Sequence, residues 1–210
     1  AVTPARRQGL AVVVTLHANA ATHHWTPERL FRGTGAPGFP AYRDLVEEVS
    51  GRLNRLGPQD LAFEPVNEPP QSCGAAEWAD VQRQLLAAAR GVAPGLTLLA
   101  TGACGSMIAG LPSLRTRPLA AFEPLLFTFH FYEPYVFSHQ GARWMSEPFY
   151  PVLNAVPWPA AQGNLATTLA AVRTRMETTG QPPLGSGAAT YREAERVLKQ
   201  YFEAQPARPF

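Results

Sequence analysis

The stretch Leu-Ala-Phe-Glu-Pro-Val-Asn-Glu-Pro-Pro, residues 61 to 70, decides the fold. Phe63 and Val66 have side chains that favour a β-strand. The prolines at positions 69 and 70 lack the amide hydrogens that further pairing needs, so the chain leaves the sheet directly after Glu68. The alternative interpretation is a polar turn. The stretch predicts a strand that ends on a carboxyl group, and strand ends of this kind carry the catalytic residues of barrel enzymes.

Composition limits the classes of protein and partner. With 210 residues, 46% of them hydrophobic, the chain is expected to form one domain over residues 1–210 around a sizeable core. The net charge is +2, and acidic and basic residues are interspersed, so no nucleic-acid partner is expected. No segment reaches the roughly 20 apolar residues of a membrane span, and the N-terminus lacks the apolar centre of a signal peptide. No membrane partner is expected.

Strand and helix patterns alternate along the chain. Strand patterns lie at residues 9–17, 61–68, 96–100 and 124–131, and helical patterns at 42–56, 75–92, 165–178 and 191–202. This alternation indicates parallel βαβ units and an α/β fold. The sequence has neither a glycine-rich phosphate loop nor a nucleophile elbow, which disfavours nucleotide binding and serine hydrolysis.

Polar side chains stand at the ends of three of these strand patterns: His17, Asn67, Glu68, His130 and Tyr132. Because the carboxyl ends of parallel barrel strands meet on one face, we expect these side chains to surround one pocket. Histidines that only hydrogen-bond are one alternative. A zinc site with two His ligands and one carboxylate is another, but short His-x-x-x-His spacing is absent, so no metal and no cofactor is expected.

Three segments resemble glycoside hydrolase family 5, the cellulase-like (β/α)8 barrels. Val-Val-Thr-Leu-His at residues 13–17, Phe-Glu-Pro-Val-Asn-Glu-Pro at 63–69 and Phe-His-Phe-Tyr-Glu-Pro at 129–134 are similar to the family's strands three, four and six, in the same order. The resemblance covers residues 5 to 140 and extends weakly beyond them. It implies a parallel TIM-barrel fold and hydrolysis of β-1,4-linked glucan with retention at the anomeric carbon.

The resemblance also implies roles for the strand-end residues. Glu68 is expected to protonate the leaving glycosidic oxygen and then to activate water. Asn67 is expected to hold the sugar 2-hydroxyl, and Tyr132 to steady the nucleophilic carboxylate. His17 and His130 resemble histidines that bind sugar hydroxyls or orient the carboxyls.

Tryptophans in loops are further candidates for substrate binding. Trp25 and Trp144, and with them Trp158, are expected near the active face, where flat rings stack on sugars, although each is also explained as a packing residue. Trp78 falls on the apolar face of a helical pattern and is predicted to be in the core.

The chain departs from the family where the nucleophile is expected. A retaining glycosidase needs a second carboxylate about 5 Å from the first, and the family supplies it in a Gly-Glu-Phe-Gly type segment ending strand seven. The small-residue segment at 184–187 has Ser at the acidic position, and Glu133 and Glu147 are better explained as loop residues, so the nucleophile is unknown. The helices at 165–178 and 191–202 are interpreted as a crossover after strand six.

These departures predict a partial barrel, an internal fragment that holds about strands three to six. Such a sheet is expected to self-associate through exposed edges, to bind a complementing segment, or to be marginally stable. The parent protein is expected to be a secreted or periplasmic β-glucanase. Alternatives are an inactive carbohydrate-binding barrel relative and a mannan-hydrolysing relative. Cys73 and Cys104 are either two thiols or a disulfide that joins two loops.

Overall fold

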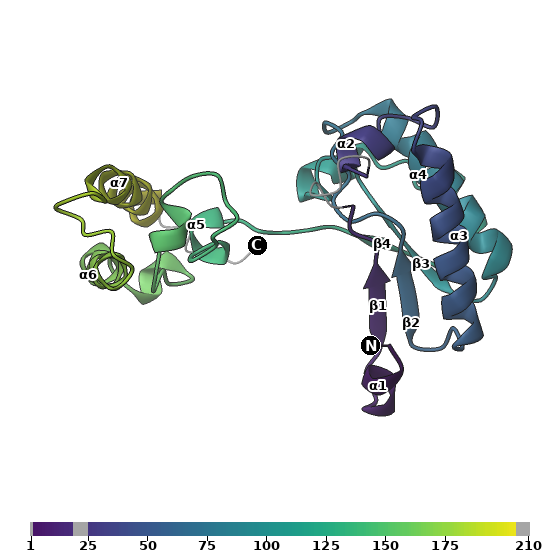
Figure 1. The fold of residues 1–210 in the computed structure, drawn as a ribbon, viewed down its shortest axis with the longest axis horizontal. Coiled ribbons are helices and arrows are strands. Elements are labelled where there is room, and N and C mark those ends of the chain that lie inside the picture. The colour runs from purple at the N-terminus through teal and green to yellow at the C-terminus, as the bar shows by residue number, and fades with distance from the viewer. Residues whose placement is uncertain (1, 19–24, 205–210) are drawn as a thin grey trace. The chain divides into compact units, whose positions relative to one another are not determined.

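The computed structural model describes residues 2–18 and 25–204. The chain forms two compact units, Ala1–Phe131 and Tyr132–Phe210, each with its own cluster of buried apolar side chains (Figure 1). The sequence predicts a single domain over 1–210, and that assignment stays a prediction beside the two separate cores.

The first unit is built on a four-stranded parallel sheet. Its strands lie in the order β1 (Val12–Thr15), β2 (Leu61–Glu64), β3 (Thr97–Thr101), β4 (Leu125–Thr128). The register pairs Thr15 with Glu64 and Leu98 with Leu125. This confirms the predicted parallel α/β fold, although β1, β2 and β4 are shorter than the predicted 9–17, 61–68 and 124–131.

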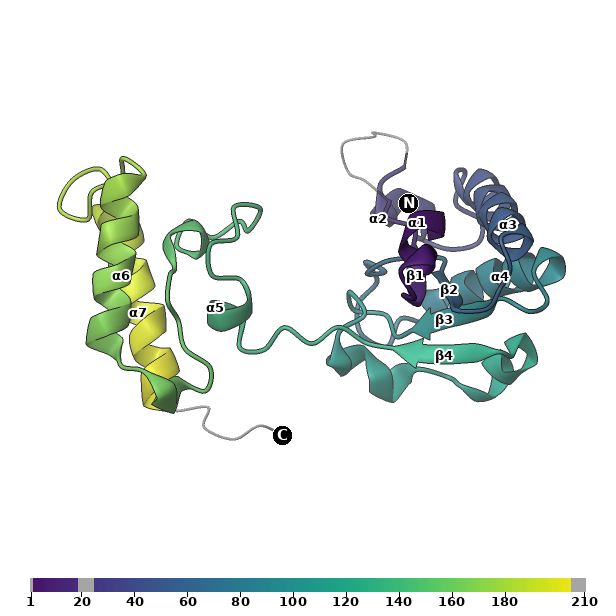
Figure 2. The ribbon, with the colours of Figure 1, turned by 90° about the horizontal axis from the view of Figure 1, so that it is seen from below.

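Two long helices, α3 (Phe39–Arg55) and α4 (Ala76–Val92), lie on the same side of this sheet (Figures 1 and 2). α3 begins three residues before the predicted start at Tyr42, because Pro40 is accepted in the first turn of a helix. Four short helices, α1 (Val2–Arg7), α2 (Pro27–Leu30), η1 (Ile108–Ser113) and η2 (Arg117–Phe122), were not expected from the sequence.

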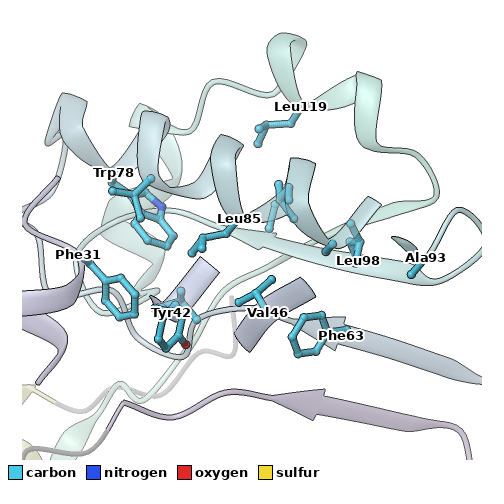
Figure 3. Close-up of a cluster of buried hydrophobic side chains, with 14 of the residues drawn as sticks. Phe31, Tyr42, Val46, Phe63, Trp78, Leu85, Ala93, Leu98 and Leu119 are labelled. Atoms are coloured by element: carbon cyan, nitrogen blue, oxygen red, sulfur yellow. The ribbon is translucent and has the colours of Figure 1, made fainter. Parts of the chain in front are cut away.

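The core of the first unit lies between the sheet and these two helices. Phe63 of β2 and Leu98 of β3 are fully buried there, facing Val46 of α3 and Leu85 of α4 (Figure 3). Trp78 is also buried, and its Nε1 donates to the carbonyl oxygen of Thr101 at 2.8 Å, which confirms that it is a core residue.

The opposite side of the sheet, here called the open face, is partly exposed. Side chains alternate along a strand, and Val12 and Val14 of β1 and Leu125 of β4 pack against the core. The residues between them therefore point the other way, and Val13 and Leu126 are each 58% exposed. By the same alternation the open face carries Thr15, His17, Glu64, Thr128 and His130.

Arg90 ties the end of α4 to the start of β3 and β4. Its Nη1 donates to three backbone carbonyls and its Nη2 to two more: Ala93 (2.7 Å), Pro94 (2.9 Å) and Leu96 (2.8 Å), then Phe122 (2.7 Å) and Pro124 (3.0 Å). Burial lowers the pKa of Arg90, and Glu123 opposes this shift. The Arg90 side chain thus links the end of α4 to the segments that precede β3 and β4.

The regular elements described in the second unit are helices. It contains α5 (Tyr135–Ser138), η3 (Tyr150–Val152), η4 (Ala160–Gln162), α6 (Leu165–Thr178) and α7 (Ala188–Ala204). The bounds predicted for α6 are confirmed, since Asn164 caps it by accepting a hydrogen bond from the Thr167 amide at 2.9 Å. α7 is longer than its predicted 191–202. Residues 184 to 187 form turns, so no strand leads into Ser186.

Candidate active site

Four polar side chains form two hydrogen-bonded pairs at the carboxyl ends of the strands. Asn67 Nδ2 lies 2.5 Å from His17 Nε2, and His130 Nδ1 lies 2.8 Å from Glu68 Oε1. His17 follows β1, Asn67 and Glu68 follow β2, and His130 follows β4. The structure therefore groups these residues as the sequence predicts, while their roles toward a sugar stay predictions.

The hydrogen bonds fix the orientation of both imidazoles. An amide nitrogen only donates, so Nε2 of His17 accepts from Asn67. Nδ1 of His130 donates to the Glu68 carboxylate. The Glu68 side chain is 40% exposed and that of His130 is 20% exposed, so the carboxyl remains accessible.

The backbone after β2 explains how Glu68 is presented. The Asn67 amide still donates to the Leu16 carbonyl at 3.0 Å, which prolongs the pairing of β1 with β2 to the end of the segment. Glu68 then adopts φ +46°, a left-handed conformation uncommon for a residue with a side chain and frequent at functional sites. Below it, Tyr42 of α3 donates to the Pro65 carbonyl at 2.7 Å. The chain leaves the sheet where the prolines predict.

The loop after β3 supports both Glu68 and His130. Its amides at Cys104 and Gly105 donate to the carbonyls of Gln71 (2.8 Å) and Pro69 (2.9 Å), directly after Glu68. The carbonyl of Ser106 in this loop accepts from the His130 amide at 2.7 Å. Cys73 and Cys104 form a disulfide, which decides between the two states left open by the sequence. Glu68 and His130 are thus held by the same loop.

Two glycines let this loop fold against the end of β3. A Cβ on Gly102 would lie 2.7 Å from the backbone of Gly110, and a Cβ on Gly110 would lie 2.2 Å from the carbonyl oxygen of Ala103. Contacts below 3.0 Å do not occur for real side chains. Only glycine fits either position without moving the backbone.

Glu64, the last residue of β2, is a site residue that the sequence analysis did not single out. It is 6% exposed, and burial raises its pKa. The Thr15 hydrogen bond and the nearby His130 and His17 oppose that shift, whereas Glu68 adds to it. The sequence contains a signal for this residue, because strand alternation places position 64 on the same face of the sheet as Thr15.

The grouping of the remaining predicted residues with Glu68 stays a prediction, and the structure gives each of them other surroundings. Tyr132 and Trp144 belong to the second unit, where the ring of Tyr132 lies 5.2 Å from that of His139 and Trp144 is 81% exposed. Trp25 belongs to the first unit and packs against Tyr42, with ring centroids 6.0 Å apart. This contact supports packing for Trp25, and its part in sugar binding stays a prediction.

Metal sites, cavities and membrane-spanning helices are the other features that bear on function in the part of the chain that the structure describes. No group of three or more His, Cys, Asp or Glu residues there is arranged to hold a metal ion. A cavity of about 150 Å³ lies between α4 and residues 113–119, and none of the four paired side chains lines it. None of the described helices has the length and apolarity needed to cross a membrane.

Comparison with known proteins gives the same family as the sequence motifs. The family model of cellulase (glycosyl hydrolase family 5) matches residues 1–184. Endoglucanase 3 of Fibrobacter succinogenes is 32% identical over 104 residues, which are 48% of this chain and 15% of that protein.

Solved structures share the fold. Thermotoga maritima Cel5A in complex with cellobiose aligns with a TM-score of 0.61 and 20% identity, over 86% of this chain and 54% of that one. Cellulose synthase subunit Z of Clostridioides difficile aligns with a TM-score of 0.60 and 16% identity, over 95% of this chain and 66% of that one. The chain thus spans less than two thirds of each relative, and its fold is part of a (β/α)8 barrel. Since the family model covers most of its length, the chain belongs to glycosyl hydrolase family 5, the cellulases.

Proposed function

We propose that the first unit carries the acid/base part of an active site that hydrolyses β-1,4-linked glucan, with Glu68 as the proton donor. The observation that carries this proposal is the hydrogen bond between Glu68, which follows β2, and His130, which follows β4, together with the Asn67–His17 pair. Family membership supports the reaction class.

Glu68 would donate its proton to the glycosidic oxygen and later remove one from water. His130 acts through Glu68: its Nδ1 holds one carboxyl oxygen and so restricts the orientation of the carboxyl group. The left-handed backbone at Glu68 and the two prolines after it limit the positions that the carboxyl can reach. Such positioning is worth orders of magnitude in rate.

Asn67 would bind the sugar beside the bond that breaks. Because its Nδ2 is held by His17, its carbonyl oxygen has a fixed direction and can accept a hydrogen bond from a hydroxyl group. A site built to bond a hydroxyl discriminates strongly against sugars that lack it. The 2-hydroxyl is the expected partner.

A retaining mechanism is proposed with its nucleophile unassigned. It needs a carboxylate about 5 Å from Glu68. Glu64 is buried, and neither Glu133 nor Glu147 is assigned this role. Turnover is therefore proposed for the whole protein, and sugar binding for the chain described here. The Cys73–Cys104 disulfide supports a secreted or periplasmic location, since disulfides persist in oxidising compartments.

The substrate class is inferred from the relatives. Structures of Thermotoga maritima Cel5A, which share the fold at 20 to 22% identity, are described as complexes with cellobiose and with mannotriose. A β-linked glucan is the proposed substrate, and a mannan is the alternative substrate to be tested beside it.

The test measures binding of cellotetraose and mannotetraose to this chain by calorimetry, and hydrolysis of both by the whole protein. We expect the chain to bind cellotetraose and Asn67→Ala to weaken binding about tenfold, a loss of the size expected for one hydrogen bond. In the whole protein, Glu68→Gln should reduce kcat at least 100-fold, as for other general acids. Glu47→Gln, on the exposed side of α3, is the matched control.

The outcomes separate the alternatives. Hydrolysis that survives Glu68→Gln would overturn the role of Glu68. Binding without hydrolysis in the whole protein would replace the enzyme with a carbohydrate-binding relative. If mannotetraose is bound and cleaved in preference to cellotetraose, the glucan assignment is wrong.

A further inference from the structure

Glu64 occupies a position that the proposed reaction does not use. It ends β2 on the open face, paired in register with Thr15 of β1, whose hydroxyl hydrogen-bonds to it. Its side chain is almost completely buried, and its Oε1 has no hydrogen-bond partner among the residues that the structure describes. A buried carboxyl oxygen without a partner is costly, so its presence here calls for an explanation.

The charged surroundings of Glu64 are the candidate site itself. The groups whose charges act on it are His17 at the end of β1, Glu68 after β2 and His130 after β4. The neighbouring strand β3 contributes uncharged side chains only, Thr97 to Thr101. Two carboxyls and two imidazoles therefore form one electrostatic cluster, with Glu64 as its buried member.

Such a cluster solves a problem for a proton donor. A protonated imidazole beside a carboxyl favours the ionised carboxylate, which is the wrong state for donation. A second carboxylate has the opposite effect, because two nearby negative charges are unfavourable and one carboxyl keeps its proton. His130 contacts Glu68 directly, so a nearby negative charge would offset the effect of its imidazole.

We propose that Glu64 is a positioning residue of this site, a buried carboxyl whose negative charge offsets the imidazoles of His17 and His130 and so favours the protonated, donating form of Glu68. This inference rests on the proposed role of Glu68. It adds a residue that acts without touching the substrate, because its carboxyl is buried beneath the strand ends.

The test follows the Glu64 side-chain carboxyl by carbon-13 NMR during a pH titration of the unliganded chain. We expect Glu68→Gln to lower the pKa of Glu64, because a like charge is lost. His130→Gln and Thr15→Val should raise it, because an opposite charge and a hydrogen-bond donor are lost. Shifts of about half a pH unit or more are expected for groups this close in a partly buried site, and Glu47→Gln should cause none.

This test does not require sugar turnover, so its failure is distinct from failure of the proposed function. If Glu68→Gln and His130→Gln leave the titration of Glu64 unchanged, the coupling is absent and the inference is overturned. Amide spectra of each variant show whether it is folded. Thr15 is exposed, so Thr15→Val provides an independent measurement of the shift in the Glu64 pKa if one of the other variants does not fold.

A second measurement uses the whole protein. Glu64→Gln keeps the shape of the side chain and removes its charge, so we expect an unchanged KM, a lower kcat and a pH–rate profile whose upper limb moves to lower pH. Glu64→Asp, which keeps the charge, should restore the profile in part. A kcat loss without any movement of the pH profile would indicate a structural role and contradict the inference.

Discussion

Removal of the Cys73–Cys104 disulfide should lower stability while leaving the site intact. The two cysteines are 31 residues apart, and closing a loop of that length removes chain entropy from the unfolded state worth about 4 kcal/mol. The native loop keeps its other restraints, because the amides of Cys104 and Gly105 still donate to Gln71 and Pro69. The cost of Cys73→Ala with Cys104→Ala is therefore expected in the free energy of unfolding, and the Glu68–His130 hydrogen bond should persist.

The assay is urea unfolding followed through the amide resonances of β2, which report on the first unit alone. With a typical dependence of about 2 kcal/mol per molar urea, the midpoint should fall by about 2 M. Reductant should destabilise the wild type to the level of the double variant and have no effect on the variant itself. A loss below about 1 kcal/mol would refute the loop-entropy argument, and loss of the His130–Glu68 contact would show that the disulfide shapes the site.

Three further changes test contacts within the first unit. Arg90→Ala should cost about 3 to 4 kcal/mol. Its four Nη hydrogens can make at most four of the hydrogen bonds to carbonyls at full strength, each worth about 1 kcal/mol. Urea unfolding checks this, and a loss no larger than that of Arg83→Ala would contradict it. Tyr42→Phe should cost about 1 to 2 kcal/mol in the same assay, since it leaves the buried Pro65 carbonyl without its donor. Burial raises the folded-state pKa of Glu64 above the ordinary 4.5. The resulting contribution to the free energy of unfolding is fully present below pH 4.5 and is lost as pH rises through the folded-state pKa. Glu64→Gln should therefore gain stability relative to the wild type between pH 4 and pH 7, and a constant difference would contradict the burial of its charge.

The sequence predicts the first unit well because its elements are marked locally. The apolar stripe of α4 gives its bounds to within one residue, whereas β2 ends at Glu64, four residues before the predicted end at Glu68. β4 ends at Thr128, before the predicted residue 131, because its apolar pattern continues where strand pairing stops. Hydrophobicity alone does not mark the end of an edge strand.

The candidate site could be predicted in part for the same reason. His17, Asn67, Glu68 and His130 stand at strand ends, and parallel topology alone brings them together. Glu64 was missed because its importance depends on burial and on charges from two other strands.

The second unit shows what the sequence does not encode locally. Its core joins Phe149 and Leu153, from a segment without regular periodicity, to Val172 of α6 and Leu198 of α7. Contacts between positions this far apart in the chain leave no local pattern, so a separate core was not expected.

The contact between Gly102 and Gly110 restricts how the segment after β3 can be altered. Any other residue at either position would displace the backbone of residues 102–110, whose Ser106 carbonyl holds the His130 amide, so this segment cannot be reshaped one substitution at a time. Engineering of the region around Glu68 would have to begin in a different loop, and a library that randomises residues 102–110 should return the two glycines unchanged.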